Sequence, residues 1–198
     1  MQLITKISEN ISYLPAKENP LSADVVFITQ PDCCWIFDVG TNEDAFNYIE
    51  EINLPKKIVL SHFHQDHSTN LNRISYDELY VGQNKTREFP EQIVVTEPKA
   101  LGNIKIVPVV ASHSKGCLIL VFEEYAFLGD AIYPTEKTGR PCYNAQQLLD
   151  EIRTLKTLDV KYFCTSHATV FVKSKDSIIT HLEEIYSKRI GNEPYIWL

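Results

Sequence analysis

The sequence lacks the cysteine patterns that build disulfide frameworks and thiolate zinc sites. Its 198 residues include five cysteines, and no two of them have the C-x-x-C spacing. An odd count without paired spacing argues against a disulfide scaffold, and a cysteine within an apolar run behaves as a small buried hydrophobic residue. We therefore expect reduced thiols and a cytoplasmic protein.

Long apolar runs and a secretory leader are also missing. No stretch approaches the ~20 apolar residues that are needed to span a bilayer. The N-terminus turns polar at Ser8-Glu9-Asn10, before the apolar part of a signal peptide could form. These two absences predict a soluble protein that associates with no membrane.

Positive charge is scarce as well. The chain has 19 Lys and Arg against 26 Asp and Glu, which gives a formal net charge of -7. Such a surface repels phosphate backbones, so we expect a small-molecule substrate and no nucleic-acid partner. At this length, with 44% hydrophobic residues, one core suffices, and residues 1–198 are expected to form a single domain.

The hydrophobic pattern alternates between strand and helix. Apolar runs predict strands at residues 25–29, 33–39, 57–60, 104–110, 117–123, 125–128 and 161–165. Helical spacing predicts helices at 44–51, 144–158 and 174–190, with caps at Thr41 or Asn42 for the first and Ser174 or Asp176 for the last. Strands followed by a helix, twice along the chain, are typical of a layered α/β domain.

The strand predicted at 57–60 is followed at once by the run His62-Phe63-His64-Gln65-Asp66-His67. Imidazole and carboxylate are ligands that zinc and similar cations prefer. A solvated polar loop is the more common explanation for any one of these histidines. For the whole H-x-H-x-D-H run at a strand end, a metal site is the better interpretation, because a divalent ion satisfies polar groups that are costly to bury.

One short loop cannot enclose two ions, so further ligands are expected downstream. Three candidates each follow a predicted strand: His113, Asp130 in Gly129-Asp130, and His167 in Ser166-His167. Each by itself could be a loop or capping residue. His181 lies within the last predicted helix and is expected on the surface.

These residues together resemble the metallo-β-lactamase fold superfamily. The landmarks occur in order: Asp38 after a strand, the run His62–His67, His113, Asp130 and His167. The resemblance implies an α/β fold, specifically a four-layer αβ/βα sandwich. It implies that Asp38 braces the ligand loop through backbone hydrogen bonds and does not bind metal.

The resemblance also implies how the ligands divide between two metal ions. His62, His64 and His113 would hold the first ion, Asp66, His67 and His167 the second, and Asp130 would bridge both. Zinc is the expected metal, with iron or manganese as alternatives. Many hydrolases of this family have glycines beside the later histidines, whereas this chain has Ser112-His113-Ser114 and Ser166-His167-Ala168, so these loops are expected to differ.

The expected activity is hydrolysis of a thioester, a lactone or a similar ester-like bond by a hydroxide held between the two ions. Asp66 and Asp130 would take part as metal ligands. Tyr133 stands three residues after Asp130 and resembles an oxyanion donor of lactone-hydrolysing relatives, with packing beneath the loop as its alternative role. A di-iron redox protein or oxygenase, or a phosphodiesterase or nuclease, are the alternative classes.

Overall fold

The computed structural model describes residues 4–83 and 89–198. The chain divides into two compact units, Met1–Thr96 and Glu97–Leu198, and each is described by itself. The expectation of a single domain over residues 1–198 stays a prediction.

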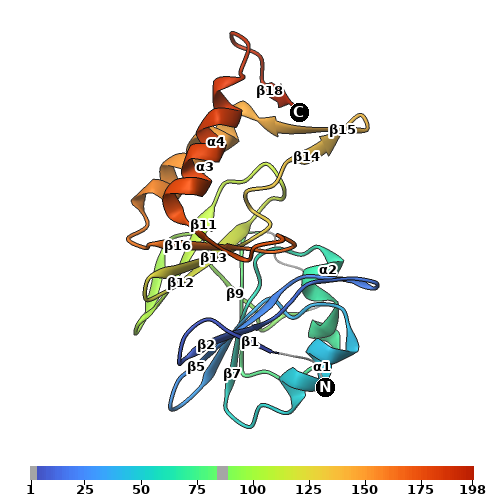
Figure 1. The fold of residues 1–198 in the computed structure, drawn as a ribbon. Helices are drawn as coiled ribbons and strands as arrows, with labels where there is room; N and C mark the ends of the chain where they lie inside the picture. Colours follow the sequence, from blue (N-terminus) through green and yellow to red (C-terminus); the bar gives the residue numbers. More distant parts are fainter. Residues whose placement is uncertain (1–3, 84–88) are drawn as a thin grey trace. The chain divides into compact units, whose positions relative to one another are not determined.

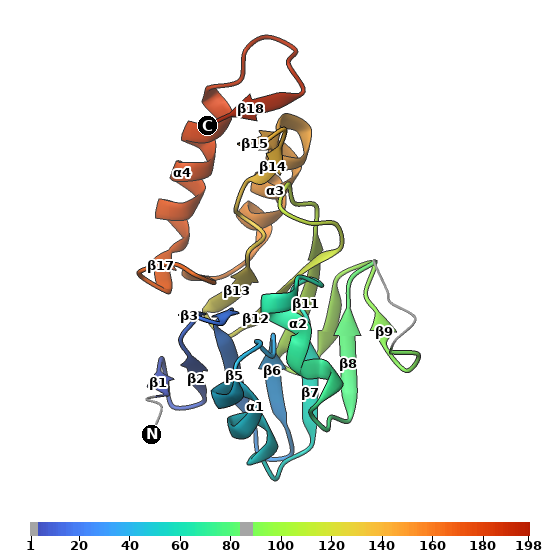
Figure 2. The same ribbon diagram turned by 90° about the vertical axis from the view of Figure 1, so that its right-hand side faces the viewer.

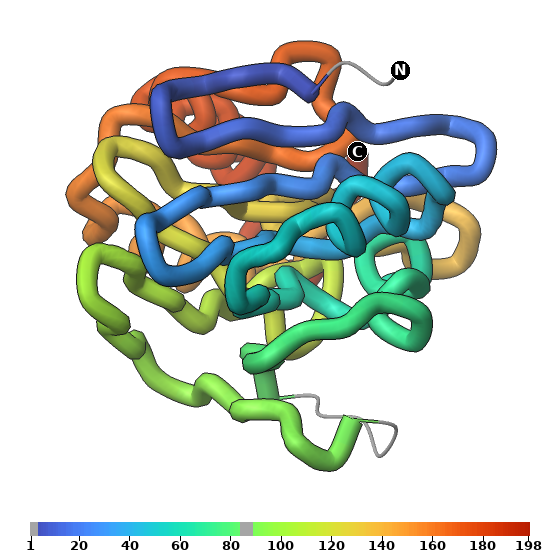
Figure 3. Tube along the Cα trace, turned by 90° about the horizontal axis from the view of Figure 1, so that it is seen from below, coloured from blue at the N-terminus to red at the C-terminus, as the bar shows by residue number. Residues whose placement is uncertain are grey.

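The first unit is built on a seven-stranded sheet in the order β1-β2-β5-β6-β7-β8-β9. Its strands are β1 (Thr5–Lys6), β2 (Ile11–Leu14), β5 (Val25–Thr29), β6 (Cys34–Phe37), β7 (Lys56–Val59), β8 (Glu78–Val81) and β9 (Ile93–Val94). The strands from β1 to β6 run antiparallel, seen as neighbouring blue segments in Figure 3, and those from β6 to β9 run parallel, as Figure 2 shows. Parallel neighbours bring the carboxyl ends of β6 and β7 to the same edge of the sheet.

Helix α1 (Glu43–Glu50) packs against this sheet, and its Asn42 side chain accepts a hydrogen bond from the Ala45 backbone as the N-cap. Ala45 and Ile49 belong to one buried cluster with residues of β5 to β8. Each large apolar side chain buried there contributes roughly 1.5–3 kcal/mol. The hairpin of β3 (Lys17–Glu18) and β4 (Leu21–Ser22), the short helix α2 (Gln65–Ser68) and the 3-10 turn η1 (Thr69–Asn72) complete the described part of the unit.

The second unit contains a six-stranded sheet in the order β10-β11-β12-β13-β16-β17 and a three-stranded sheet in the order β14-β15-β18. The larger sheet consists of β10 (Lys99–Leu101), β11 (Ile104–Val109), β12 (Cys117–Phe122), β13 (Tyr125–Gly129), β16 (Tyr162–Thr165) and β17 (Val172–Ser174). The smaller sheet consists of β14 (Thr135–Lys137), β15 (Arg140–Asn144) and β18 (Tyr195–Trp197). Within the larger sheet, β13 and β16 run parallel.

Two helices cover the second unit, α3 (Ala145–Thr157) and α4 (Lys175–Ser187), which lie side by side in Figure 1. Their apolar faces share one buried cluster with the larger sheet, including Leu148 and Leu155 of α3 and Leu182 of α4. The side chain of Asn144 caps α3, and that of Ser174 caps α4.

The sequence located all three longer helices, and Asn42 and Ser174 are the caps among the proposed alternatives. The prediction did not include the small sheet, and no local pattern encodes the pairing of its strand β18 with β15 across about fifty residues of chain. None of the helices in the described part of the chain has the length and apolar character that crossing a membrane requires.

Candidate metal centre

The first group of predicted ligands follows β7. His62 and His64 lie in the turn after the strand, whereas Asp66 and His67 lie in α2, whose N-cap position is His64. The run is therefore part turn and part short helix. The rings of His62 and His64 have centroids 4.3 Å apart, and those of His62 and His67 4.2 Å apart. The Nε2 atom of His67 lies 3.4 Å from Asp66 Oδ2.

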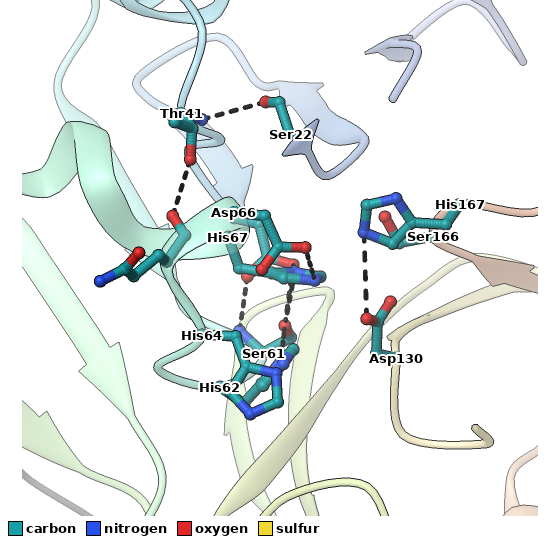
Figure 4. A network of polar contacts seen from close by, with 12 residues as sticks. Ser22, Thr41, Ser61, His62, His64, Asp66, His67, Asp130, Ser166 and His167 are labelled. Atoms are coloured by element: carbon teal, nitrogen blue, oxygen red, sulfur yellow. Dashed lines mark hydrogen bonds and ion pairs between the residues drawn. The ribbon is translucent and has the colours of Figure 1, made fainter. Parts of the chain in front are cut away.

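A buried polar network holds this group in place (Figure 4). Asp38 follows β6 and Ser61 follows β7, so the parallel pairing of the two strands brings the side chains together. Asp38 Oδ1 accepts a hydrogen bond from the Ser61 amide at 2.7 Å, and its Oδ2 accepts from the Ser61 hydroxyl at 2.8 Å. His67 Nδ1 lies 2.7 Å from the same Oδ2. Asp38 thus braces the ligand run through a backbone bond, as the sequence predicted, and through two side-chain bonds as well.

The backbone after Asp38 adds a second support. The amides of Val39 and Gly40 donate to the carbonyl of His67 at 2.9 and 3.2 Å. A Cβ at Gly40 would lie 2.7 Å from Ser22 Oγ, so this close approach requires glycine. Asp38 itself has a φ of 60°, a left-handed conformation that Asp tolerates better than most residues.

The second group lies at one edge of the larger sheet in the second unit. Asp130 and His167 follow the neighbouring parallel strands β13 and β16, and His113 lies in the turn between β11 and β12. The register of β13 shifts between Phe127 and Gly129, and a bulge of this kind changes the direction of the side chains that follow it. Sheet order therefore gathers three residues that are far apart in the sequence.

Asp130 is the centre of this second group. Its Oδ2 lies 3.5 Å from His113 Nε2 and 3.9 Å from His167 Nε2, and Figure 4 shows the contact with His167. The other ring nitrogen of His113, Nδ1, lies 3.3 Å from the carbonyl oxygen of Pro134. Both histidines thus turn Nε2 toward the same carboxylate oxygen.

The loop around His167 adopts an unusual backbone conformation. His167 has a φ of 58°, which is uncommon for a residue other than glycine and is a form of strain often found at functional sites. The Ser166 amide donates to the Gly129 carbonyl at 3.0 Å, and the Tyr133 hydroxyl donates to the Ser166 carbonyl at 2.6 Å. Tyr133 therefore holds the loop that carries His167.

The predicted site residues follow strands within their own units, with Asp66 and His67 in the short helix α2. The structure brings the four ligands of the His62–His67 run together in the first unit, and His113, Asp130 and His167 together in the second. His181 is exposed on α4, as expected. Ser61 was missed, although its position directly before the first histidine was a signal that could have drawn attention to it. The assignment of ligands to two ions stays a prediction.

The donor atoms in each unit fit a divalent cation. Ligand atoms about 2.0–2.1 Å from a tetrahedral ion lie roughly 3.4 Å from each other. His67 Nε2 and Asp66 Oδ2 are 3.4 Å apart, and His113 Nε2 and Asp130 Oδ2 are 3.5 Å apart. Ligand histidines generally direct their second ring nitrogen to an oxygen atom, and His67 and His113 both do so.

Comparison with protein-family models gave no match, and neither did comparison with curated protein sequences. Solved structures do match. The metallo-β-lactamase DIM-1 aligns at a TM-score of 0.68 and 14% identity, covering 93% of this chain and 96% of its own. ETHE1 from Myxococcus xanthus aligns at a TM-score of 0.68 and 16% identity, covering 90% of this chain and 85% of its own.

A third match is a mutant of a flavo di-iron protein from Thermotoga maritima. It aligns at a TM-score of 0.66 and 13% identity, covering 97% of this chain and 64% of its own. At these identities the matches establish the fold. The chain has the metallo-β-lactamase fold, and the predicted α/β class is confirmed.

Proposed function

We propose that this protein is a metal-dependent hydrolase that cleaves a thioester, a lactone or a similar ester-like bond of a small metabolite. The observation that carries the proposal is the spacing of the ligand atoms in each unit. Imidazole Nε2 and carboxylate oxygen lie 3.4 Å apart in one case and 3.5 Å in the other, as expected for two ligands of one ion.

The proposal assigns the two groups to one dinuclear centre. His62, His64 and His113 would hold one ion, Asp66, His67 and His167 the other, and Asp130 would bridge them. Zinc is the proposed metal, because imidazole and carboxylate together suit it. Two such ions, when bound, supply Lewis acidity and lower the pKa of a water molecule toward neutrality.

The residues of the chain would position this chemistry. Asp38 orients His67 through Nδ1, and the Pro134 carbonyl does the same for His113. Fixed ligands of this kind lose little conformational freedom when an ion binds. Tyr133 remains a candidate oxyanion donor, although its hydroxyl proton is already given to the Ser166 carbonyl. A cytoplasmic location is part of the proposal, since all five cysteines are buried thiols that suit a reducing compartment.

The test is elemental analysis of purified protein, combined with a substrate panel of one thioester, one lactone and one phosphodiester. The expected result is two equivalents of zinc per chain and hydrolysis of the thioester or the lactone. A chelator should remove metal and activity together, and added zinc should restore both. Unchanged turnover after complete metal removal would overturn the proposal, and hydrolysis of the phosphodiester alone would reassign the substrate class.

A di-iron redox protein is the second candidate. The observation that favours it is the match to the flavo di-iron protein over 97% of this chain. Imidazole and carboxylate ligands suit iron as well as zinc. Iron in the purified protein together with oxygen consumption would select this candidate, whereas zinc with hydrolysis would exclude it.

A further inference from the structure

Ser61 connects a ligand of each proposed ion to the same buried carboxylate. Its hydroxyl oxygen lies 2.8 Å from Asp38 Oδ2, 2.9 Å from His62 Nδ1 and 3.3 Å from His67 Nδ1. Asp38 is 0% exposed, Ser61 1%, His62 2% and His67 0%. These four side chains are almost completely shielded from bulk solvent, so each hydrogen bond between them needs a proton from one of its two partners.

Counting protons fixes the direction of each hydrogen bond. A serine hydroxyl has one proton, and an ionised carboxylate can only accept. The Ser61 proton therefore goes to Asp38 Oδ2. The hydroxyl oxygen can then only accept from His62 Nδ1, so that nitrogen carries a hydrogen. His67 Nδ1 likewise donates to Asp38 Oδ2.

We propose that Ser61 is a positioning residue that, together with Asp38, fixes His62 and His67 as Nδ1–H tautomers. The Nε2 atom of each ring is then the one with a lone pair for a metal ion. The ligand assignment rests on the proposed function, whereas the tautomers do not. One hydroxyl and one carboxylate thus set the ligand atom for both ions, since His62 and His67 belong to different ligand sets.

The experiment reads the tautomers directly. Two-bond ¹H–¹⁵N correlation spectra of the metal-free protein distinguish Nδ1–H from Nε2–H in neutral imidazole, at about pH 8, above the usual histidine pKa near 6.5. The expected result for the unmodified protein is Nδ1–H at both His62 and His67. Nε2–H at either ring would overturn the inference.

Three serine variants separate orientation from simple packing. Ser61→Ala removes the acceptor for His62 and should let the Nε2–H tautomer appear at that ring, while His67 keeps its bond to Asp38. Ser61→Thr keeps the hydroxyl and should show the same tautomers of His62 and His67 as the unmodified protein. Ser68→Ala is the matched control, because among the described residues that hydroxyl donates to the His64 carbonyl in the same segment and to no ring nitrogen, and it should change neither tautomer.

Asp38→Asn should reverse the direction of the hydrogen bonds that Ser61, His62 and His67 make in this network. The Ser61 amide donates to Oδ1, so the amide oxygen of the variant stays at that position and its NH₂ group takes the place of Oδ2. That group can only donate, so Ser61 turns its proton to His62 and both rings become Nε2–H. Retention of Nδ1–H at both rings in a folded Asp38→Asn protein would contradict the inference.

Zinc affinity supplies a second readout. Loss of a group that orients a metal ligand typically lowers metal affinity 10–100-fold. Ser61→Ala should therefore weaken one of two zinc equivalents by roughly that factor, with Ser61→Thr and Ser68→Ala near the unmodified protein. If the tautomers follow the prediction but no variant or unmodified protein binds zinc, the proposed function fails alone. If zinc and turnover are normal but Ser61→Ala changes neither tautomer nor affinity, the inference on Ser61 fails alone.

Discussion

The two groups of predicted ligands are held by different means. In the first unit, side chains contact the rings: the Ser61 hydroxyl contacts His62 and the Asp38 carboxylate contacts His67, and both rings are almost completely buried. In the second unit the acceptors are backbone carbonyls: His113 Nδ1 lies 3.3 Å from the Pro134 carbonyl, and the Ser166 carbonyl in the His167 loop accepts from the Tyr133 hydroxyl. His113 and His167 are only partly buried.

This difference decides where substitutions should matter. A carbonyl oxygen is present whatever the side chain, so we expect the contact of His113 with the Pro134 carbonyl to survive substitutions around it. A buried carboxylate that accepts three hydrogen bonds cannot be replaced without leaving donors unsatisfied.

The largest effect is expected from removing one ligand in each unit. The double variant His64→Ala, Asp130→Ala should lose both metal equivalents and lower turnover by more than about 10³-fold, because the proposed ions would supply the nucleophile. Elemental analysis and a thioester or lactone assay measure the two losses.

The single variants show whether the two groups act as one centre. Each of His64→Ala and Asp130→Ala should reduce metal content by itself. Full metal content and full turnover in the double variant would refute the dinuclear site.

The next largest effect is expected from removing the Asp38 carboxylate, which supports the first group. Asp38→Ala leaves buried donors of Ser61 and His67 without their acceptor, which costs about 1–3 kcal/mol per group, and metal affinity should fall 10–100-fold. Chemical denaturation and zinc competition measure both.

Ser112→Ala is the matched variant in the second unit. Ser112 precedes His113, and its hydroxyl oxygen accepts a hydrogen bond from the backbone amide of Asn144. Loss of this bond should cost about 0.5–1.5 kcal/mol of stability, with little change in zinc affinity. Equal losses of affinity in the Asp38 and Ser112 variants would remove the contrast between the two groups.

A third prediction contrasts two buried carboxyl groups. Asp38 is fully hydrogen-bonded, whereas neither carboxyl oxygen of Glu151 on α3 has a hydrogen-bond partner among the described residues. Burial raises the pKa of Glu151 well above its ordinary value, and the nearby Tyr143 has its pKa raised by burial first and by Glu151 as a further cause.

The sign of the pH effect follows from this shift. Above the unfolded glutamate pKa near 4.3, the folded state binds more protons than the unfolded state, so stability falls as pH rises, by at most about 1.4 kcal/mol per pH unit. Glu151→Met should remove this slope and gain stability over the unmodified protein as pH increases from 5 to 8. Denaturation of metal-free protein across that range measures it, with the exposed Glu184→Met as control. If the stability difference between Glu151→Met and the unmodified protein did not change with pH, a raised pKa of Glu151 would be contradicted.

The smallest effect is expected at Tyr133. Tyr133→Phe removes the bond to the Ser166 carbonyl and should cost about 0.5–1.5 kcal/mol of stability, with turnover reduced less than about tenfold. Steady-state kinetics with a lactone or a thioester decides whether Tyr133 only supports the His167 loop or also donates to an oxyanion. An oxyanion donor would instead cost about 10²–10³ in kcat with stability barely changed.

Much of the site could be predicted before the structure. The run His62–His67 is a local pattern, and its position after a strand is visible in the hydrophobic sequence. That His113, Asp130 and His167 belong together could be proposed only because each follows a strand. Whether they meet depends on the order of the strands in the sheet. The bond from Ser61 to Asp38 and the bond from the Tyr133 hydroxyl to the Ser166 carbonyl could not be predicted, because only the tertiary structure brings their partners together.

The sequence by itself determined which side chains are candidate ligands, most of the strands and helices that carry them, and the resemblance that pointed to the fold. It did so because ligand chemistry and hydrophobic periodicity are local properties of the chain. Only the tertiary structure decided which atoms are turned toward the site. That choice depends on where β6 and β7 place Asp38 beside Ser61, where β13 and β16 place Asp130 beside His167, and which nitrogen each buried contact occupies.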